Sequence, residues 1–123
     1  GEIQPEDEFY SYEAKYIDEN GAVLNIPAKL EDGLVQKVQN LAEKTFKVLC
    51  CEGMARVDFF INQEDIVLVN EINTIPGFTR ISMYPKLWEE SGISYPKLID
   101  KLIELALQRY KEEKNLKTSI KLK

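Results

Sequence analysis

Two alternating runs separated by a short polar stretch most constrain what this chain can fold into. Residues 54–62 and 66–73 are rich in β-branched and aromatic side chains that alternate with polar ones, and residues 62–65 read Asn-Gln-Glu-Asp. Alternation with a period of two is typical of strands that bury one face. The two runs and the polar turn between them therefore predict a β-hairpin.

The hairpin would bring polar side chains of both strands together on one face. We take Ile61 and Ile66 as the pair that flanks the turn. In that register Arg56 lies opposite Glu71, and Asp58 is a diagonal neighbour of Glu71, ~7–8 Å away at the backbone. Alternation adds three more residues of the second strand to this face, namely Val67, Val69 and Asn73. We call Arg56, Asp58, Glu71 and Asn73 the polar cluster.

The polar cluster has two interpretations. An Arg56–Glu71 pair on a solvated face is common, and Asp58 could simply flank it. Alternatively, oxygen-bearing side chains beside a guanidinium suit Mg²⁺ and phosphate. Two features favour a site: Asp and Asn are depleted from strands, yet Asp58 and Asn70 lie within these runs. A Pro-Gly turn at residues 74–79 also follows directly and would place backbone amides beside the acidic groups.

Composition excludes several classes of function. The sequence has 123 residues, enough for one domain or part of one, and its net charge of −5 with no basic stripe gives no reason to propose nucleic acid. Its apolar runs are too short for a membrane span. Because there is no histidine, Ser-His-Asp and Cys-His catalysis are excluded and zinc is improbable. The adjacent Cys50 and Cys51 are poorly placed to bridge each other, which indicates reduced thiols in the cytosol.

Helical periodicity and turn signals outline the remaining elements. The spacing of apolar residues predicts an amphipathic helix over residues 31–49 and a buried stripe on a long helix opened by Pro96. The other expected features are an irregular acidic start at 2–8, strands at 9–16 and 23–27, a turn at 18–21, a short helix at 85–90 and a frayed basic tail at 114–123.

The segment of residues 9–16 is a second candidate region. It crowds Phe9 and three tyrosines into eight positions, and Lys15 stands just before a turn-rich stretch. Aromatic crowding usually means packing, and a surface on which an adenine stacks is the less common explanation. Alone, this segment decides nothing.

Five motifs together resemble a known family. They are residues 9–16 (Phe-Tyr-Ser-Tyr-Glu-Ala-Lys-Tyr), 26–28 (Ile-Pro-Ala), 55–60 (Ala-Arg-Val-Asp-Phe-Phe), 70–79 (Asn-Glu-Ile-Asn-Thr-Ile-Pro-Gly-Phe-Thr) and 82–85 (Ser-Met-Tyr-Pro). In this order they resemble the C-terminal part of D-alanine–D-alanine ligases and their D-alanine–D-serine relatives, which are ATP-grasp enzymes. The resemblance runs from Gly1 to about Tyr110, and Ser11 stands where the family often has Asp.

The resemblance implies a fold and missing partners. We expect an α+β unit, the C-terminal part of an ATP-grasp fold, over residues 1–113. An antiparallel sheet around the hairpin would carry the helices at 31–49 and 96–110 packed on one face. The chain would start partway through the ATP-grasp region, and the N-terminal and central domains of a homodimeric ligase would complete it.

The resemblance also assigns metal and nucleotide ligands. Asp58, Glu71 and Asn73 match the ligands of two Mg²⁺ (or Mn²⁺) ions, with Glu71 as the bridge. The positions that match nucleotide contacts are Phe9 against the adenine, Lys15 at the phosphates, and Asn70 with Glu71.

The catalytic and substrate-binding positions follow in the same way. Arg56 matches the arginine that neutralises charge on the transferred phosphoryl group and on the tetrahedral intermediate. Tyr16 matches a loop tyrosine that closes over the acceptor site, which favours an amino acid over D-lactate. Gly77 supplies an amide to the oxyanion, and Ser82 with the Met83 backbone matches the grip on the acceptor's carboxylate.

The implied activity is ATP-dependent formation of D-alanyl-D-alanine through a D-alanyl phosphate, for peptidoglycan synthesis in the cytoplasm. Three alternatives stay open: a D-alanine–D-serine ligase of vancomycin resistance, an ATP-grasp ligase with another carboxylate donor, and a non-catalytic module that binds ATP and Mg²⁺ weakly or only packs against a partner. We expect no activity from these 123 residues alone.

Overall fold

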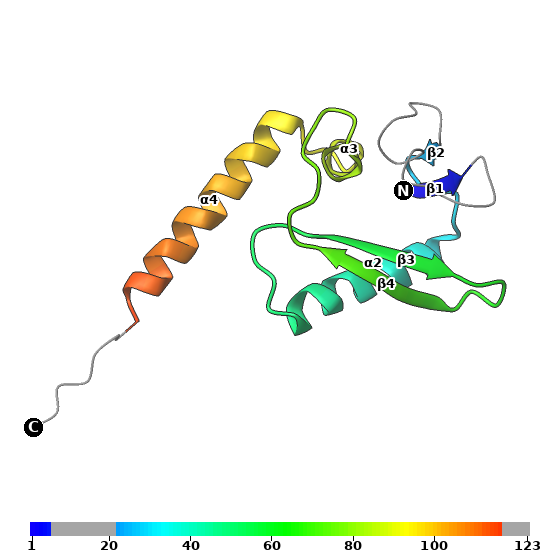
Figure 1. Ribbon diagram of the computed structural model, residues 1–123, viewed down its shortest axis with the longest axis horizontal. Helices are drawn as coiled ribbons and strands as arrows, with labels where there is room; N and C mark the ends of the chain where they lie inside the picture. Colours follow the sequence, from blue (N-terminus) through cyan, green and yellow to red (C-terminus); the bar gives the residue numbers. More distant parts are fainter. Residues whose placement is uncertain (6–21, 117–123) are drawn as a thin grey trace, which may run out of the picture.

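The computed structural model describes residues 1–5 and 22–116 and has an α+β architecture (Figure 1). Its elements are β1 (Glu2–Pro5), β2 (Ala22–Asn25), α2 (Asp32–Val48), β3 (Arg56–Ile61), β4 (Val67–Asn73), α3 (Met83–Glu90) and α4 (Tyr95–Lys114). We expected a strand with ligand contacts at residues 9–16, including Phe9, Lys15 and Tyr16, and a turn at 18–21. All of these residues lie outside the part of the chain that the structure describes. α4 includes Lys114, and the rest of the basic tail beyond residue 116 also lies outside the described part.

Strands β3 and β4 form the predicted hairpin, but in a different register. Ile61 pairs with Val67 and not with Ile66. Asn62 closes the turn: its backbone N–H donates to the Ile66 carbonyl at 3.2 Å, and its Oδ1 accepts the N–H groups of Glu64 and Ile66. An asparagine side chain that caps its own turn in this way is a common turn device.

A β-bulge at Asn70 changes the register within the hairpin. On the turn side Phe59 pairs with Val69, whereas on the other side Asp58 pairs with Glu71, so Asn70 is an extra residue on β4. The prediction that Val67 and Val69 share a face with Glu71 and Asn73 is therefore wrong. Val69 lies opposite Phe59, on the face away from Asp58.

Helix α2 packs against both strands of the hairpin. Its inward residues are half-buried and recur at helical spacing: Leu34, Val38, Leu41, Ala42, Thr45 and Phe46. The helix ends where Cys50 adopts a positive φ of 51°, and the Cys51 N–H donates to the Phe46 carbonyl at 3.0 Å. The predicted helix over residues 31–49 is confirmed.

Helix α4 packs against α3 rather than beside α2 on the hairpin, and in Figure 1 it runs away from the strands. The expectation that this helix also covers the sheet is therefore wrong for most of its length. Arg109 of α4 contacts Glu52, in the loop before β3, at 2.6 Å. Between α4 and the loop after β4 lies an apolar groove of about 380 Å³, whose lining includes Met54, Ile75, Leu102 and Ile103.

Strand β1 corrects the prediction of an irregular acidic start. It pairs antiparallel with β2, and Glu2 stands directly opposite Asn25. The Glu2 carboxylate accepts hydrogen bonds from Gln4 at 3.0 Å and Asn25 at 3.2 Å, which hold the pKa of Glu2 below its usual value. Strand β1 is held by backbone pairing with β2 and by these side-chain hydrogen bonds. Because it has no alternating apolar pattern, periodicity did not predict it.

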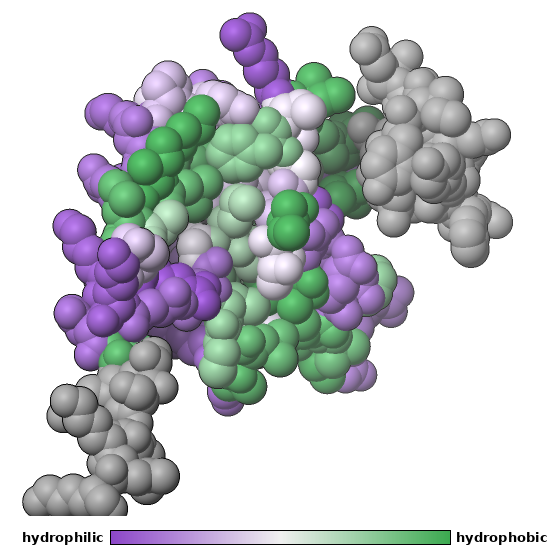
Figure 2. Space-filling model, turned by 60° about the vertical axis from the view of Figure 1, so that its left-hand side comes forward, coloured by the Kyte–Doolittle hydropathy of each residue, from purple (hydrophilic) through white to green (hydrophobic). Residues whose placement is uncertain are grey.

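Few apolar side chains are fully buried in the described part of the chain. Tyr84 and Leu98 keep only 6% and 3% of their surface exposed, whereas Phe60 keeps 63% and Ile75 keeps 79%. Figure 2 shows apolar side chains gathered in several patches on the face seen there. Contiguous exposed apolar patches are typical of surfaces that contact another protein, a membrane or a ligand. None of the helices in the described ranges has the length and apolar content needed to cross a bilayer.

Replacing Leu98 with alanine tests the small core. Because Leu98 is the more deeply buried of the two core residues, Leu98→Ala should lower the free energy of unfolding by about 2–5 kcal/mol. Urea denaturation followed by circular dichroism measures the change. The control is Leu105→Ala on the same helix, where the side chain is 46% exposed and the loss should be clearly smaller. Equal losses would contradict the packing described here.

Candidate functional site

The hairpin places the polar cluster in two facing pairs. Arg56 lies directly opposite Asn73, and Asp58 lies directly opposite Glu71. Directly opposed residues of an antiparallel pair point to the same face, with Cβ atoms about 4.5–5.5 Å apart. The register therefore brings the two carboxylates closer together than the diagonal arrangement that the sequence predicted.

Arg56 holds Asp58 through two parallel hydrogen bonds. Its Nε donates to Asp58 Oδ1 and its Nη2 donates to Asp58 Oδ2, both at 2.8 Å. Both side chains are partly buried, with 27% and 29% of their surface exposed. This bidentate geometry is the strongest form of an arginine–carboxylate pair, so it fixes the orientation of Asp58 before any ligand arrives.

Glu71 and Asn73 are held differently. Arg56 Nη2 lies 3.9 Å from Glu71 Oε1, an ion pair beyond hydrogen-bond distance, and Glu71 keeps 59% of its side chain exposed. Asn73 Oδ1 accepts the Ile75 N–H at 3.0 Å, which fixes this amide at the exit of β4. The exposed Glu71 can therefore adjust to a ligand, whereas Asp58 and Asn73 are oriented in advance.

The chemistry of these donors fits a hard divalent cation. Mg²⁺ usually takes one or two carboxylates and completes its shell with water and phosphate oxygens. Within residues 1–5 and 22–116, no three His, Cys, Asp or Glu side chains gather as a metal-binding group, so the carboxylates of Asp58 and Glu71 need the amide of Asn73 as third donor. Each oxygen that is already hydrogen-bonded retains a second lone pair, which leaves all three residues able to coordinate.

The loop after β4 holds a second group of polar atoms. Ser82 Oγ accepts the Thr79 N–H at 3.1 Å and shares a hydrogen bond of 2.8 Å with Thr79 Oγ1. Gly77 lies against this hydroxyl: a Cβ at position 77 would stand 3.0 Å from Ser82 Oγ. Ser82 precedes the first residue of α3, Met83, so its hydroxyl is held close to the helix N-terminus.

The predicted site residues thus fall into two groups joined by one loop. Arg56, Asp58, Glu71 and Asn73 face one another, Asn70 is the bulge beside them, and Gly77, Ser82 and Met83 lie at the far end of the loop. The sequence reasoning missed Thr79. Its hydroxyl stands three residues before Ser82, a spacing that could have signalled a local side-chain hydrogen bond.

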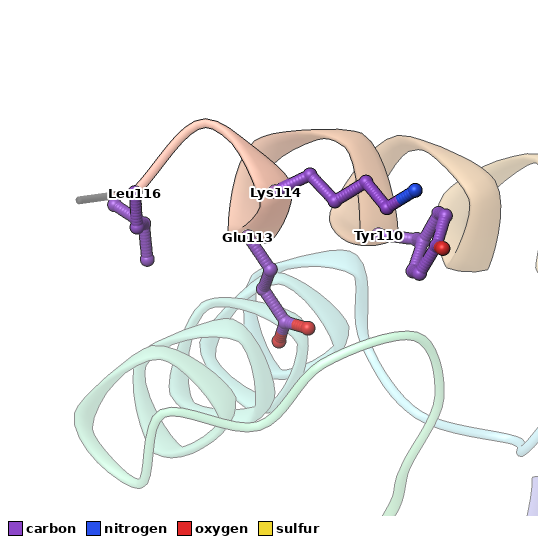
Figure 3. A pocket seen from close by; sticks show the side chains of 4 residues that line it. All are labelled: Tyr110, Glu113, Lys114 and Leu116. Carbon is purple, nitrogen blue, oxygen red and sulfur yellow. The ribbon is translucent and has the colours of Figure 1, made fainter. Parts of the chain in front are cut away.

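A pocket of about 360 Å³ at the end of α4 is separate from both groups. Tyr110, Glu113, Lys114 and Leu116 line it, and Figure 3 shows the Lys114 side chain reaching toward Tyr110. The Lys114 Nζ lies 4.7 Å from the centre of the Tyr110 ring, a cation–π contact. This pocket contains none of the residues of the polar cluster, and we assign it no role in the site.

Comparisons with known proteins agree on one family. The family described as D-ala D-ala ligase C-terminus matches residues 1–104. The chain is 61% identical over 119 residues to a D-alanine–D-alanine ligase of Oceanobacillus iheyensis, covering 97% of this chain and 32% of that protein. The chain therefore spans about a third of the length of the curated relatives that it matches.

Solved structures give the same likeness. The D-alanine–D-alanine ligase from Coxiella burnetii superimposes with a TM-score of 0.74 and 52% identity, over 76% of this chain and 27% of that one. The ligase from Bacillus anthracis complexed with ATP superimposes with a TM-score of 0.65 and 38% identity, over 69% of this chain and 30% of that one. The predicted fold class, the C-terminal part of an ATP-grasp fold, is confirmed.

Substitution of Gly77 tests the close approach to Ser82. Gly77→Ala should displace the Ser82 hydroxyl, weaken its bonds to Thr79 and lower the free energy of unfolding by about 0.5–1.5 kcal/mol, the usual contribution of one hydrogen bond. Hydrogen exchange at the Thr79 amide should become faster. The matched control is Gly33→Ala in α2, where a Cβ meets no atom within 4 Å and the helix should gain up to about 1 kcal/mol. Unchanged exchange at Thr79 would contradict this view of the loop.

Proposed function

The chain belongs to the family of D-alanine–D-alanine ligase C-terminal domains, and on this basis we propose that it forms the C-terminal third of an ATP-dependent ligase that joins two D-amino acids. The observation that carries the proposal is the pairing of Arg56 and Asp58 with Asn73 and Glu71 across the hairpin. It combines a guanidinium with three oxygen ligands on rigid strands, as phosphoryl transfer requires.

The first proposed step activates a carboxylate. A carboxylate is a poor electrophile, so a carboxylate oxygen of the first D-alanine attacks the γ-phosphorus of ATP. The bond to the β-phosphate oxygen breaks, and ADP and D-alanyl phosphate form. Arg56 would neutralise the transferred group, and its two hydrogen bonds to Asp58 fix its side chain beside a proposed metal ligand. Two Mg²⁺ or Mn²⁺ ions held by Asp58, Glu71 and Asn73 would screen the repulsion between the anionic reactants.

The second proposed step forms the amide bond. The amine of the second D-amino acid attacks the carbonyl carbon of D-alanyl phosphate, the C–O bond to phosphate then breaks, and the nitrogen loses a proton. Negative charge develops on the carbonyl oxygen, and Arg56 with the Gly77 amide would stabilise it. Ser82 and the Met83 backbone would bind the acceptor's carboxylate, which the helix N-terminus also favours.

The nucleotide contacts rest on the family resemblance. Phe9 would lie against the adenine, Lys15 would reach the phosphates, and Asn70 would lie beside the nucleotide at the bulge next to Glu71. Tyr16 would close over the acceptor. Because acyl phosphates hydrolyse, the segment after Lys15 would exclude water while the intermediate exists.

We place the reaction in peptidoglycan synthesis in the cytoplasm, within a homodimer of the complete ligase. The free thiols of Cys50 and Cys51 agree with a reducing compartment. N-terminal and central domains would supply the remaining substrate contacts, and the exposed apolar patches agree with such neighbours. The relatives reported above are named for D-alanine, so we propose D-alanine as the acceptor. Rates with D-alanine alone and with added D-serine would separate this from a D-alanine–D-serine ligase.

A charge-neutral change at Glu71 tests the metal and phosphate site. In the complete ligase, Glu71→Gln should lower the rate of ADP release with D-alanine by ~100-fold or more, because a principal electrostatic stabiliser is lost. The control is Glu64→Gln in the turn of the same hairpin, which is exposed and should retain full activity. A Glu71→Gln enzyme with near-normal turnover would refute the assignment.

Thermal melting with nucleotide separates an ATP-binding site from a module that only packs against a partner. ATP at 100 times its Kd should stabilise the complete ligase by about 2.7 kcal/mol, and only when Mg²⁺ is present. Asp58→Asn should remove most of this shift because one carboxylate ligand is lost. A shift that is equally large in EDTA would mean that the divalent ion plays no part in binding.

A further inference from the structure

Helix α4 contacts the loop of residues 77–82 through Tyr95. The Tyr95 hydroxyl donates a hydrogen bond to the Phe78 carbonyl at 2.8 Å. The two rings also pack together, with centres 5.3 Å apart and an angle of 58° between their planes. Tyr95 is the first residue of α4 and is half-buried, so one side chain anchors the loop to the helix by both a ring contact and a hydrogen bond.

The hydrogen bond acts on the peptide unit that also holds Ser82. The Phe78 carbonyl and the Thr79 N–H belong to the same planar peptide group, so fixing one fixes the direction of the other. The Thr79 N–H donates to Ser82 Oγ at 3.1 Å. A continuous path therefore runs from the Tyr95 hydroxyl through this peptide to the Ser82 hydroxyl, and each bond in such a chain strengthens the next.

We propose that Tyr95 is a positioning residue for the acceptor site: it sets the Phe78–Thr79 peptide so that Ser82 presents its hydroxyl to the carboxylate of the incoming amino acid. This inference rests on the proposed function of Ser82. Because Ser82 Oγ accepts the Thr79 N–H, the hydroxyl oxygen is already held by this donor. Its own hydrogen can then be directed to a carboxylate oxygen or to Thr79 Oγ1.

The ring of Tyr95 and its hydroxyl have separable roles. Phe78 contacts Tyr84 as well, with ring centres 5.8 Å apart, and this aromatic packing does not need the Tyr95 oxygen. Tyr95→Phe retains the ring and removes the hydrogen bond. A purely structural Tyr95 would tolerate the change, whereas a positioning residue would not.

The test uses steady-state kinetics of the complete ligase that contains this chain. Tyr95→Phe should raise the KM for the second amino acid about 3- to 10-fold, the usual effect of losing one hydrogen bond. The KM for ATP should stay within about twofold, since the hydrogen bond lies in the acceptor loop. Tyr110→Phe on the same helix, where the side chain is 55% exposed, is the matched control and should change neither constant.

A double-mutant cycle identifies the route. If Tyr95 acts through Ser82, Tyr95→Phe should have little further effect in a Ser82→Ala background. An equal increase of the acceptor KM in both backgrounds would overturn the inference, as would an unchanged acceptor KM or a parallel rise for ATP. Hydrogen exchange at the Thr79 amide gives a readout without catalysis, and it should be faster in Tyr95→Phe. A wild-type enzyme that does not ligate D-amino acids would refute the proposed function instead.

Discussion

One extra residue on β4 determines which side chains meet across the hairpin. If the register set by the Ile61–Val67 pair continued without interruption, Asp58 would face Asn70 and Arg56 would face Ile72. The bulge at Asn70 shifts the pairing so that Asp58 faces Glu71, and it turns Glu71 and Asn73 toward the face that carries Arg56 and Asp58. Bulges often occur beside functional sites because they re-aim side chains in this way. The apolar face under α2 and the polar face therefore depend on the same irregularity.

The sequence predicted the polar face correctly although its register was wrong. The predicted pairing of Arg56 differs from the observed one by two residues, and a shift of two leaves every side chain on its original face. Near the turn the error is one residue, and there Val67 and Val69 were assigned to the wrong face. Periodicity alone cannot locate a bulge, and the consecutive polar residues Asn70 and Glu71 were the available sign of it.

Local signals explain the remaining successes and failures. The spacing of apolar residues predicted the helix over residues 32–48. Gly92 predicted the end of the short helix α3, and in the structure this glycine has a φ of 86°. Strand β1 could not be predicted because its pairing depends on β2, about 20 residues away, and on side-chain bonds to Glu2. The place of α4 depends on tertiary contacts with α3, which an amphipathic stripe does not specify.

Electrostatics distinguishes the two carboxylates of the polar cluster. Arg56 Nε lies 2.8 Å from Asp58 Oδ1, whereas Arg56 Nη2 lies 3.9 Å from Glu71 Oε1, so the guanidinium holds Asp58 more tightly than Glu71. Glu71 keeps 59% of its side chain exposed, so it has more freedom to move than Asp58 and could adjust to the proposed cation. The amide of Asn73 and the ring anchor of Phe78 then fix the two ends of the connecting loop. Within the polar cluster hydrogen bonds hold Asp58 and Asn73, and the loop that carries Gly77 and Ser82 is bonded to Tyr95. In the reaction that we propose, this division would let Glu71 adjust as ATP binds and ADP leaves, while the groups for the second substrate keep their positions.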